Sequence, residues 1–267
     1  MIFTNVSMFD KILETAFGVP ILFKSQTQST NVDAKEMVKN EQPVSFIVLA
    51  AQQSASYGQY GRRWVGNVIG NLYLSYALKI TNPLQNHSTI FAQYVAVELC
   101  EMLSNKFSVD LKTKWPNDIL IQSRKIGGLL LEVTRSDSSI VSAVLGIGIN
   151  ILNTPKIDNN PYPISCLQES VSVKLNFDDV LVDIIHALIE IVEGFGTINP
   201  GNFCEKWRSF DCMYGKNVVL ESQNSQTRGI DGGINELGEL IILLPNGRRI
   251  AFPQGNAKIS PGEAFSH

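Results

Sequence analysis

The 267-residue chain has few of the side chains that build metal sites and nucleophilic triads, with only four cysteines and three histidines. The cysteines are scattered and form no Cys-x-x-Cys pair, which favours reduced core or surface thiols over a metal site or a disulfide framework. The histidines, His87, His186 and His267, are equally isolated. The sequence therefore presents neither a recognisable zinc site nor a serine-type triad.

Excess positive charge and long apolar runs are also lacking. The net charge of −3 and the pI of about 5.7 argue against a nucleic-acid-binding surface, which is normally basic. No apolar run approaches the length of a membrane span, and the N-terminus has neither the basic start nor the cleavage site of a signal peptide. We therefore expect a cytoplasmic protein. Its hydrophobic content of 44% suits an ordinary globule with a sizeable core.

Hydrophobic periodicity changes along the chain. Up to about Met213, helical and strand patterns are mixed. Helices are expected at residues 10–17, 29–38, 88–107, 177–193 and 202–210, and strands at 21–24, 44–50, 71–80, 119–122, 126–133 and 140–150. Beyond that point, short strands separated by turn residues are expected at 216–221, 227–230, 239–244 and 248–252. This pattern predicts two domains, residues 1–213 and a small β-barrel over residues 214–267.

The segment Leu111–Val133, LKTKWPNDILIQSRKIGGLLLEV, carries the densest functional signal. Pro-Asn-Asp favours a turn, and the residues after it predict two strands joined by a tight connection. Lys125 opens the second strand, and Gly127-Gly128 inside it suggests a close approach by a ligand or another backbone. A cation beside bare backbone suits a carboxylate or phosphate group. Alternatively, the lysine is an ordinary hairpin residue and the glycines form a bulge.

A second candidate site is the glycine-rich stretch from Gln52 to Gly70. Its glycines would let backbone amides approach phosphate oxygens, while Arg62 and Arg63 match anion geometry and Trp64 could stack on a base. The stretch does not fit the dinucleotide-binding fingerprint, and the chain has no Walker motif. Taken alone, it could equally be a mobile surface loop.

Together these segments closely resemble the biotin–protein ligase family (biotin–acetyl-CoA-carboxylase ligases). The resemblance extends from about Ile21 into the C-terminal barrel, and its most specific part is Lys-Trp-Pro-Asn-Asp followed by Lys-x-x-Gly. The residues that carry it are Ser29-Thr30-Asn31, Gln53, Gly58 to Trp64, Lys114 to Asp118, Lys125 to Gly128, and Gly146 to Asn150.

The resemblance implies an α+β fold, in which a mixed-sheet biotin/lipoate ligase-like catalytic domain precedes an SH3-like barrel. It also implies that biotin and MgATP give biotinoyl-5′-AMP, which then acylates a lysine of a biotin carboxyl carrier protein. Lys125 would bind the biotin carboxylate and the adenylate, and Asp118 would lie near Mg²⁺ or act as a base. The implied biotin and adenylate contacts are Ser29, Thr30, Asn31, Gln53, Tyr57, Gly58, Gln59 and Gly128. The implied nucleotide contacts are Gly61, Arg62, Trp64, Asn117 and Asn150.

The chain departs from the family pattern in two places. The family loop usually reads Gly-Arg-Gly-Arg-x-Gly-Arg, whereas Tyr57 and Gln59 here replace two arginines. About twenty residues precede the first expected strand, too few for the DNA-binding domain of bifunctional members, so we expect no DNA partner and no membrane partner. Two other functions stay open: a lipoate or octanoate ligase, and a non-catalytic biotin-binding protein. A homodimer is one of the oligomeric states that the sequence does not decide.

Overall fold

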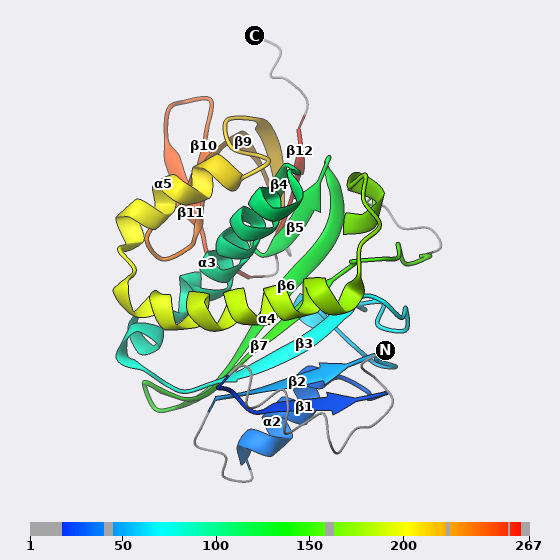
Figure 1. Ribbon diagram of the computed structural model, residues 1–267. Coiled ribbons are helices and arrows are strands. Elements are labelled where there is room, and N and C mark those ends of the chain that lie inside the picture. The colour runs from blue at the N-terminus through cyan, green and yellow to red at the C-terminus, as the bar shows by residue number, and fades with distance from the viewer. Residues whose placement is uncertain (1–17, 40–44, 158–162, 223–224, 256, 263–267) are drawn as a thin grey trace.

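The computed structural model describes residues 18–39, 45–157, 163–222, 225–255 and 257–262 (Figure 1). The helix expected at residues 10–17 lies outside this range. A seven-stranded sheet follows the order β1-β2-β3-β7-β6-β5-β4. Its strands are β1 (Ile21–Lys24), β2 (Phe46–Ala50), β3 (Leu72–Leu78), β4 (Leu111–Lys114), β5 (Asp118–Ile121), β6 (Arg124–Ser136) and β7 (Ser139–Ile149). The pair β1–β2 is parallel and the other pairs are antiparallel, which confirms the expected mixed sheet.

Helices cover the two faces of this sheet unequally. Helix α2 (Thr30–Lys39) packs on one face, and α3 (Asn82–Phe107), α4 (Phe177–Gly194) and α5 (Pro200–Phe210) lie on the opposite side (Figure 1). Successive side chains of β2 point to opposite faces of the sheet. Phe46 and Val48 pack with Ala34 of α2, whereas Ile47 and Leu49 belong to the larger core on the other face. Because side chains of a strand alternate between faces, a strand buried on both faces needs a continuous apolar run.

Strand β3 corrects one expectation. The strand expected at residues 71–80 has apolar residues at every second position from Leu72 to Ile80, which predicts a single apolar face, but all seven residues of β3 are buried. The residues of the second face, among them Tyr73 and Ala77, are small or amphipathic enough to sit beneath α2 and the loop that follows β2. Strand β4 was not expected at all, because its LKTK sequence resembles an exposed segment. Its pairing with β5 at the sheet edge overrides that weak local preference.

Two helix ends also differ from expectation. Helix α3 begins at Asn82, six residues before the predicted Ser88, with a proline in its first turn and a kink at His87, where φ is −127°. Its apolar periodicity begins only after the kink, which is why the pattern missed the first turn. Helix α4, expected at residues 177–193, is capped by Asn176. A glycine commonly ends a helix, but Gly194 keeps helical angles and the chain continues into a 3-10 turn at Phe195–Thr197.

The C-terminal region forms a five-stranded antiparallel SH3-like sheet in the order β11-β10-β9-β8-β12. Its strands are β8 (Asn217–Ser222), β9 (Ser225–Ile234), β10 (Leu240–Leu243), β11 (Arg249–Phe252) and β12 (Lys258–Pro261). Strand β12 was not predicted, because its KISP sequence is short and ends in proline. It is stabilised by its antiparallel pairing with β8.

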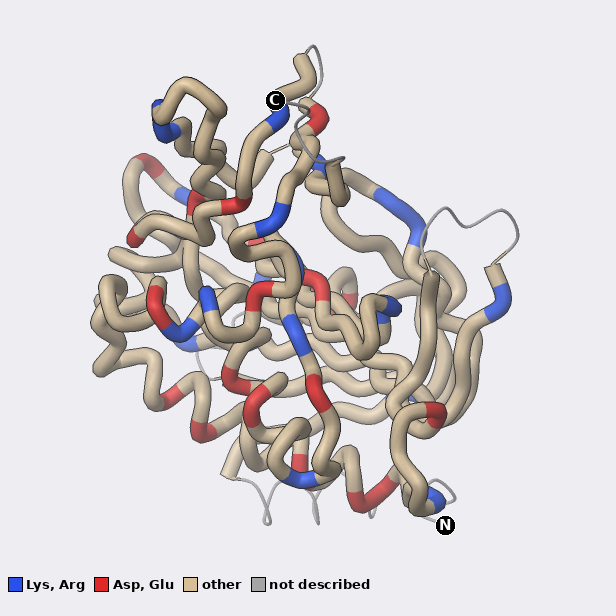
Figure 2. Tube along the Cα trace, turned by 90° about the horizontal axis from the view of Figure 1, so that it is seen from above, with Lys and Arg blue, Asp and Glu red and all other residues tan. Residues whose placement is uncertain are grey.

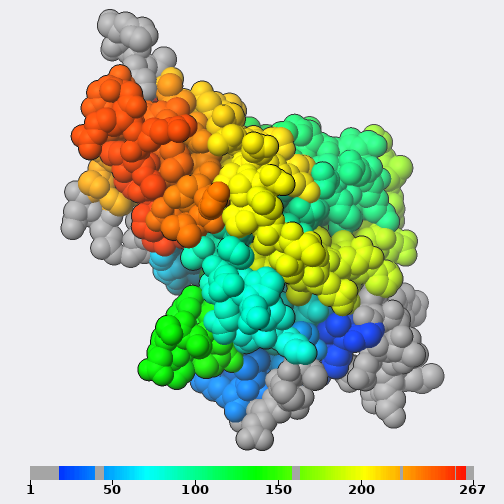
Figure 3. All heavy atoms as spheres, turned by 90° about the vertical axis from the view of Figure 1, so that its left-hand side faces the viewer, coloured from blue at the N-terminus to red at the C-terminus, as the bar shows by residue number. Residues whose placement is uncertain are grey.

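This second sheet packs directly on the N-terminal layers. Figure 3 shows the C-terminal strands against the segments of α3 and α5. The fully buried Trp115 donates its indole N–H to the carbonyl of Gly238 over 3.0 Å, and Gln93 of α3 donates to the same oxygen, also over 3.0 Å. The tryptophan of the Lys-Trp-Pro-Asn-Asp motif is therefore a packing residue between the two sheets. The domain boundary near residues 213 and 214 stays a prediction.

Charged residues of both signs are interspersed along the chain in Figure 2. Within the described ranges, no helix is both long and apolar enough to cross a membrane.

Candidate active site

A cavity of about 480 Å³ lies between the loop that follows β2 and the strands β6 and β7, on the side of the sheet that carries α2. It brings together nearly all of the residues singled out in the sequence, although they lie far apart along the chain. The lining includes Ser29, Thr30, Asn31, Gln53, Tyr57, Gly58, Gln59, Arg62, Trp64, Asn117, Asp118, Lys125, Gly128 and Asn150. Among the implied biotin and nucleotide contacts, Gly61 is the exception, because it is exposed and does not line the cavity.

One end of the cavity is built from buried polar side chains. Gln53 accepts hydrogen bonds through Oε1 from the backbone N–H of Thr30 at 2.7 Å and from its hydroxyl at 3.2 Å. The hydroxyl of Ser75 lies 2.7 Å from Thr30 Oγ1 and 2.5 Å from Asn31 Oδ1. These four residues are each at most 7% exposed. The network holds the donors and acceptors of these side chains in fixed positions, which makes them suitable for binding a polar ring of a ligand by hydrogen bonds.

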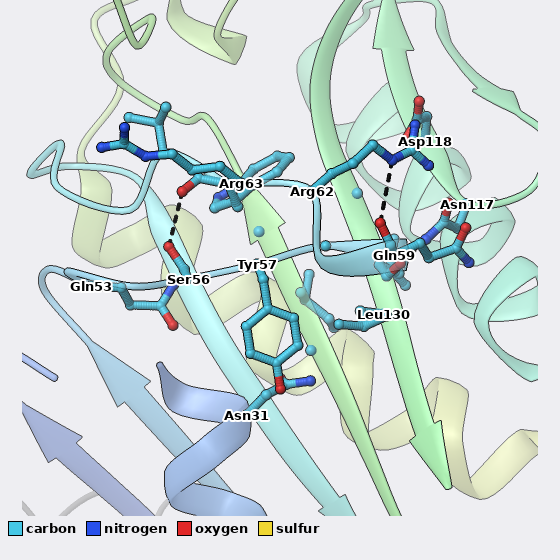
Figure 4. A pocket seen from close by; sticks show the side chains of 18 of the residues that line it. Asn31, Gln53, Ser56, Tyr57, Gln59, Arg62, Arg63, Asn117, Asp118 and Leu130 are labelled. Carbon is cyan, nitrogen blue, oxygen red and sulfur yellow. Dashed lines mark hydrogen bonds between the residues drawn. The ribbon is translucent and has the colours of Figure 1, made fainter. Parts of the chain in front are cut away.

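The loop over the cavity is folded back on itself. The N–H of Gln53 donates to Gly66 at 2.6 Å, and Ser56 Oγ donates to the carbonyl of Trp64 at 3.1 Å. Figure 4 shows Tyr57 pointing from this loop toward Asn31. The side-chain oxygen Oε1 of Gln59 is buried and has no hydrogen-bond partner among the described residues. It therefore offers an unused acceptor to a ligand.

A lysine–carboxylate pair stands at another wall of the cavity. Lys125 Nζ lies 2.5 Å from Asp118 Oδ1, joining neighbouring strands of the β5–β6 hairpin. The hairpin turn places Gln122 and Ser123 at positive φ, and Asn117 donates its amide to the carbonyl of Leu129. Both charged side chains keep roughly 30% exposure. The pair is therefore fixed in position yet open to a ligand.

Two glycines of β7 make space for the site. A Cβ on Gly146 would collide with the side-chain amide of Asn31, and one on Gly148 would lie 2.7 Å from Cε2 of Trp64. Neither position has room for a larger residue without displacing the site side chain above it. The Trp64 ring also faces Lys125, whose Nζ lies 5.4 Å from its centroid. Its indole N–H is buried without a partner among the described residues.

Gly127 and Gly128 have separate roles. A Cβ on Gly127 would lie 3.0 Å from the carbonyl oxygen of Gly148, so the close packing of the neighbouring backbone requires a glycine here. Gly128 faces Lys125 and Asp118 and lines the cavity. The sequence left open a close approach by a ligand or by another backbone: approach of a backbone fits Gly127, and access of a ligand fits Gly128. The bulge that was the other alternative lies beside them, where the register of β5 and β6 shifts between Gly127 and Lys125.

Positive charge gathers at the end of the cavity near Asp118. Lys258 of β12 lines the cavity, so the C-terminal sheet contributes a cation to it. Burial, followed by the charges of Lys125 and Lys258, holds the pKa of Lys114 below its usual range despite the nearby Asp118. Asn150 is held at this side by its amide, which donates to the carbonyl of Ser165 over 3.0 Å.

The sequence did not single out Lys35, Glu132 or Lys258. Lys35 Nζ lies 2.8 Å from Glu132 Oε1 and 2.9 Å from the hydroxyl of Tyr57. Two periodicities could have revealed the first two: Lys35 follows Asn31 by one helical turn, and Glu132 shares a strand face with Gly128. No comparable pattern identifies Lys258, because only the packing of the second sheet brings it to the cavity.

Comparisons with known proteins agree with this geometry. The model of the biotin/lipoate A/B protein ligase family matches residues 22–150, and the chain belongs to this family. Within it, the similar curated proteins are biotin ligases. The bifunctional ligase/repressor BirA of Bacillus subtilis is 25% identical over 84% of this chain and 70% of its own length. The biotin–[acetyl-CoA-carboxylase] ligase of Paracoccus denitrificans is 25% identical over 85% of this chain and 95% of its own length.

A solved structure supports the fold. The biotin protein ligase of Aquifex aeolicus in complex with biotin and ATP superposes with a TM-score of 0.77, covering 91% of this chain and 99% of its own at 22% identity.

Proposed function

We propose that this chain activates biotin with MgATP as biotinoyl-5′-AMP and pyrophosphate, and then transfers biotin to a lysine of a biotin carboxyl carrier protein. The observation that carries the proposal is the cavity itself. It contains Lys125, which is held by Asp118, together with the buried polar end around Asn31 and the ring of Trp64. Membership of the biotin/lipoate ligase family and the resemblance to biotin ligases support the same conclusion.

Biotin fits the polar end by its chemistry. Its ring system is a small apolar body with a urea group that needs donors and acceptors. The fixed side chains of Thr30 and Asn31 and the buried Ser29 provide both, while Leu74, Leu130 and Ile147 line the same cavity with apolar surface. The acid chain of biotin would then reach toward Lys125. A lipoyl or octanoyl chain has no urea and would leave the polar end without a matching partner.

Lys125 offsets the electrostatic repulsion between the two anions that react in adenylation. Activation brings the biotin carboxylate against the α-phosphate of ATP, so two anions must meet. An ammonium held at 2.5 Å by Asp118 is already positioned for that encounter and stabilises the charge that develops on the phosphate. Lys258 and Arg62 line the cavity and add positive charge for the polyphosphate. Trp64 and Asn150 are the proposed nucleotide contacts.

Magnesium enters as part of the nucleotide substrate. Among the described residues, no group of three or more metal-ligating side chains is found. Mg²⁺ commonly keeps several waters and binds through one carboxylate plus substrate phosphates, a role that the single carboxylate of Asp118 fits. Asp118 as metal ligand, and Asp118 as base for the acceptor lysine, both stay predictions. The absence of a DNA partner, the cytoplasmic location and the oligomeric state also stay predictions.

The test is a pyrophosphate-release assay with biotin, lipoate and octanoate as alternative substrates. Biotin-dependent release, followed by labelling of a carrier domain but not of its acceptor Lys→Arg variant, is the expected result. Release with lipoate or octanoate instead would identify the other acid ligase. Biotin binding without any release would indicate a non-catalytic binding protein.

A further inference from the structure

Tyr57 is tied to two secondary-structure elements outside its loop. Its hydroxyl lies 2.9 Å from Lys35 Nζ of α2 and 3.1 Å and 3.3 Å from the two carboxylate oxygens of Glu132 on β6. Lys35 and Glu132 are themselves paired at 2.8 Å. The ammonium also lies 5.6 Å from the centroid of the Tyr57 ring. A helix, a loop and a strand therefore meet at one phenolic oxygen.

This cluster continues into the polar end of the cavity. Glu132 Oε2 accepts a hydrogen bond from the amide of Asn31 at 2.9 Å, and Asn31 in turn contacts Ser75. Tyr57 and Asn31 line the cavity, whereas Lys35 and Glu132 stand behind them. Burial opposes both charges, but the hydrogen bonds among these groups outweigh it: the pKa of Lys35 is raised and the pKa of Glu132 is lowered. Both groups are therefore charged at neutral pH.

We propose that Lys35 and Glu132 are positioning residues, which hold Tyr57 over the polar end of the cavity before any ligand binds. The loop wall at the proposed biotin ring is then built in advance, and the binding of the ring does not have to order it. This inference deepens the proposed function, because it assigns the pre-formed wall to the biotin end of the cavity. Pre-organisation of this kind improves affinity by reducing the entropy lost on binding.

The loop contains two trypsin cleavage sites, which can be used to measure how often the loop opens. Arg62 and Arg63 are exposed, and both follow Tyr57 closely. A loop that is released from α2 and β6 adopts the extended conformations that trypsin needs, so the rate of cleavage after these arginines measures how well the loop is held. The ion pair between Lys24 and Asp33, 2.9 Å apart, provides a matched control, since Asp33 lies on the same helix.

The experiment compares Tyr57→Phe, Lys35→Met and Glu132→Gln with the control Lys24→Met, by limited trypsin digestion of the ligand-free protein and mass spectrometry of fragments ending at Arg62 or Arg63. Each of the three variants should be cleaved at least about tenfold faster than wild type, as expected for one lost hydrogen bond to a charged group. The control should be cleaved at the wild-type rate. The double variant Lys35→Met/Tyr57→Phe should be no faster than the faster single variant, because both changes remove the same tether.

A second readout separates this inference from the proposed function. In steady-state pyrophosphate release, the three variants should raise the KM for biotin by a similar factor, with kcat and the KM for ATP close to wild type. If biotin supports no turnover but the digestion pattern holds, the proposed function fails and the tether stands. Wild-type cleavage in all three variants, or equal acceleration by Lys24→Met, would overturn the inference.

Discussion

The ring of Trp64 lies against the bare backbone of Gly148, so closely that a Cβ on the glycine would be 2.7 Å from Cε2 of the indole. The loop residue and the strand residue are thus matched in shape: the tryptophan needs a strand without a side chain beneath it. This contact fixes Trp64 at the proposed nucleotide wall, beside Lys125.

Gly148→Ala is expected to push Trp64 out of place and weaken nucleotide binding about tenfold or more, with a smaller effect on biotin binding. The added methyl group meets a ring that cannot retreat without moving the loop, and overpacking of this kind typically costs about 1–3 kcal/mol. Titration calorimetry with ATP and with biotin measures both affinities. Gly196→Ala is the matched control, because a Cβ at Gly196 meets nothing within 4 Å. Equal loss in both variants would show that the effect is not due to Trp64.

Lys125→Ala should nearly abolish adenylate formation and leave the fold intact. Loss of a charge-assisted contact to the reacting anions should cost about 2–4 kcal/mol. Lys125→Arg should also be poor, since a planar guanidinium does not replace a compact ammonium next to Asp118. Pyrophosphate release with biotin and ATP is the measurement, and the exposed Lys79→Ala is the control. Near wild-type release by the alanine variant would refute the assigned role.

Gln59 is expected to hold the adenylate less firmly than an arginine would. It can form only neutral hydrogen bonds, about half as strong as charge-assisted ones, and its Oε1 is buried without a partner among the described residues. Escaping biotinoyl-AMP would acylate bystander lysines. We therefore expect biotinylation of serum albumin by the wild type and less of it by Gln59→Arg, measured on a streptavidin blot. Gln226→Arg, which adds the same charge on exposed β9, should label like wild type. Background labelling in every sample would show that the intermediate is retained by other means.

A buried pair of carboxyl groups lies where α5 ends near β9. Asp211 accepts hydrogen bonds from the indole of Trp207 at 3.0 Å and from the N–H of Met213 at 2.9 Å. Asp231 accepts one from the N–H of Gly233 at 2.7 Å, and its other oxygen is buried without a partner among the described residues. Burial raises the pKa of both groups, and the Asp211 charge raises that of Asp231 further.

The sign of the resulting pH dependence follows from proton uptake. Above about pH 4 the unfolded chain has lost both protons, whereas the folded pair still holds at least one. The free energy of unfolding should therefore fall as the pH rises from about 4, until the folded pair is ionised as well. Asp231→Asn removes one titrating group and keeps an acceptor for Gly233. Urea unfolding at pH 5.5, 7 and 8.5 should show a shallower decline for this variant than for wild type. Parallel declines would contradict the role of the pair.

Much of the candidate site could be predicted from local sequence. Lys125 opens a strand beside Gly127-Gly128, and this short-range pattern singled it out. Ser29 to Asn31, Asn117 and Asp118 stand in short motifs through which the family resemblance implied their roles. The same reasoning failed for β4 and β12, whose short sequences have little strand preference and are stabilised by pairing with distant partners. The sequence could not assign a role to a residue whose type is used both in packing and in ligand binding, as glycine is. Gly127 meets backbone while its neighbour Gly128 faces the cavity.

By itself, the sequence determined most of the strands and helices, the lysine hairpin and the family, because each depends on residues that are neighbours along the chain. Only the tertiary structure decided which distant residues meet. Lys35 reaches Glu132 across 97 positions, and Trp115 reaches Gly238 across 123. Lys258 joins the cavity only because the C-terminal sheet packs where it does. These contacts follow from the packing of whole layers, in which side chains on separate elements are brought together by burial of the apolar faces beneath them.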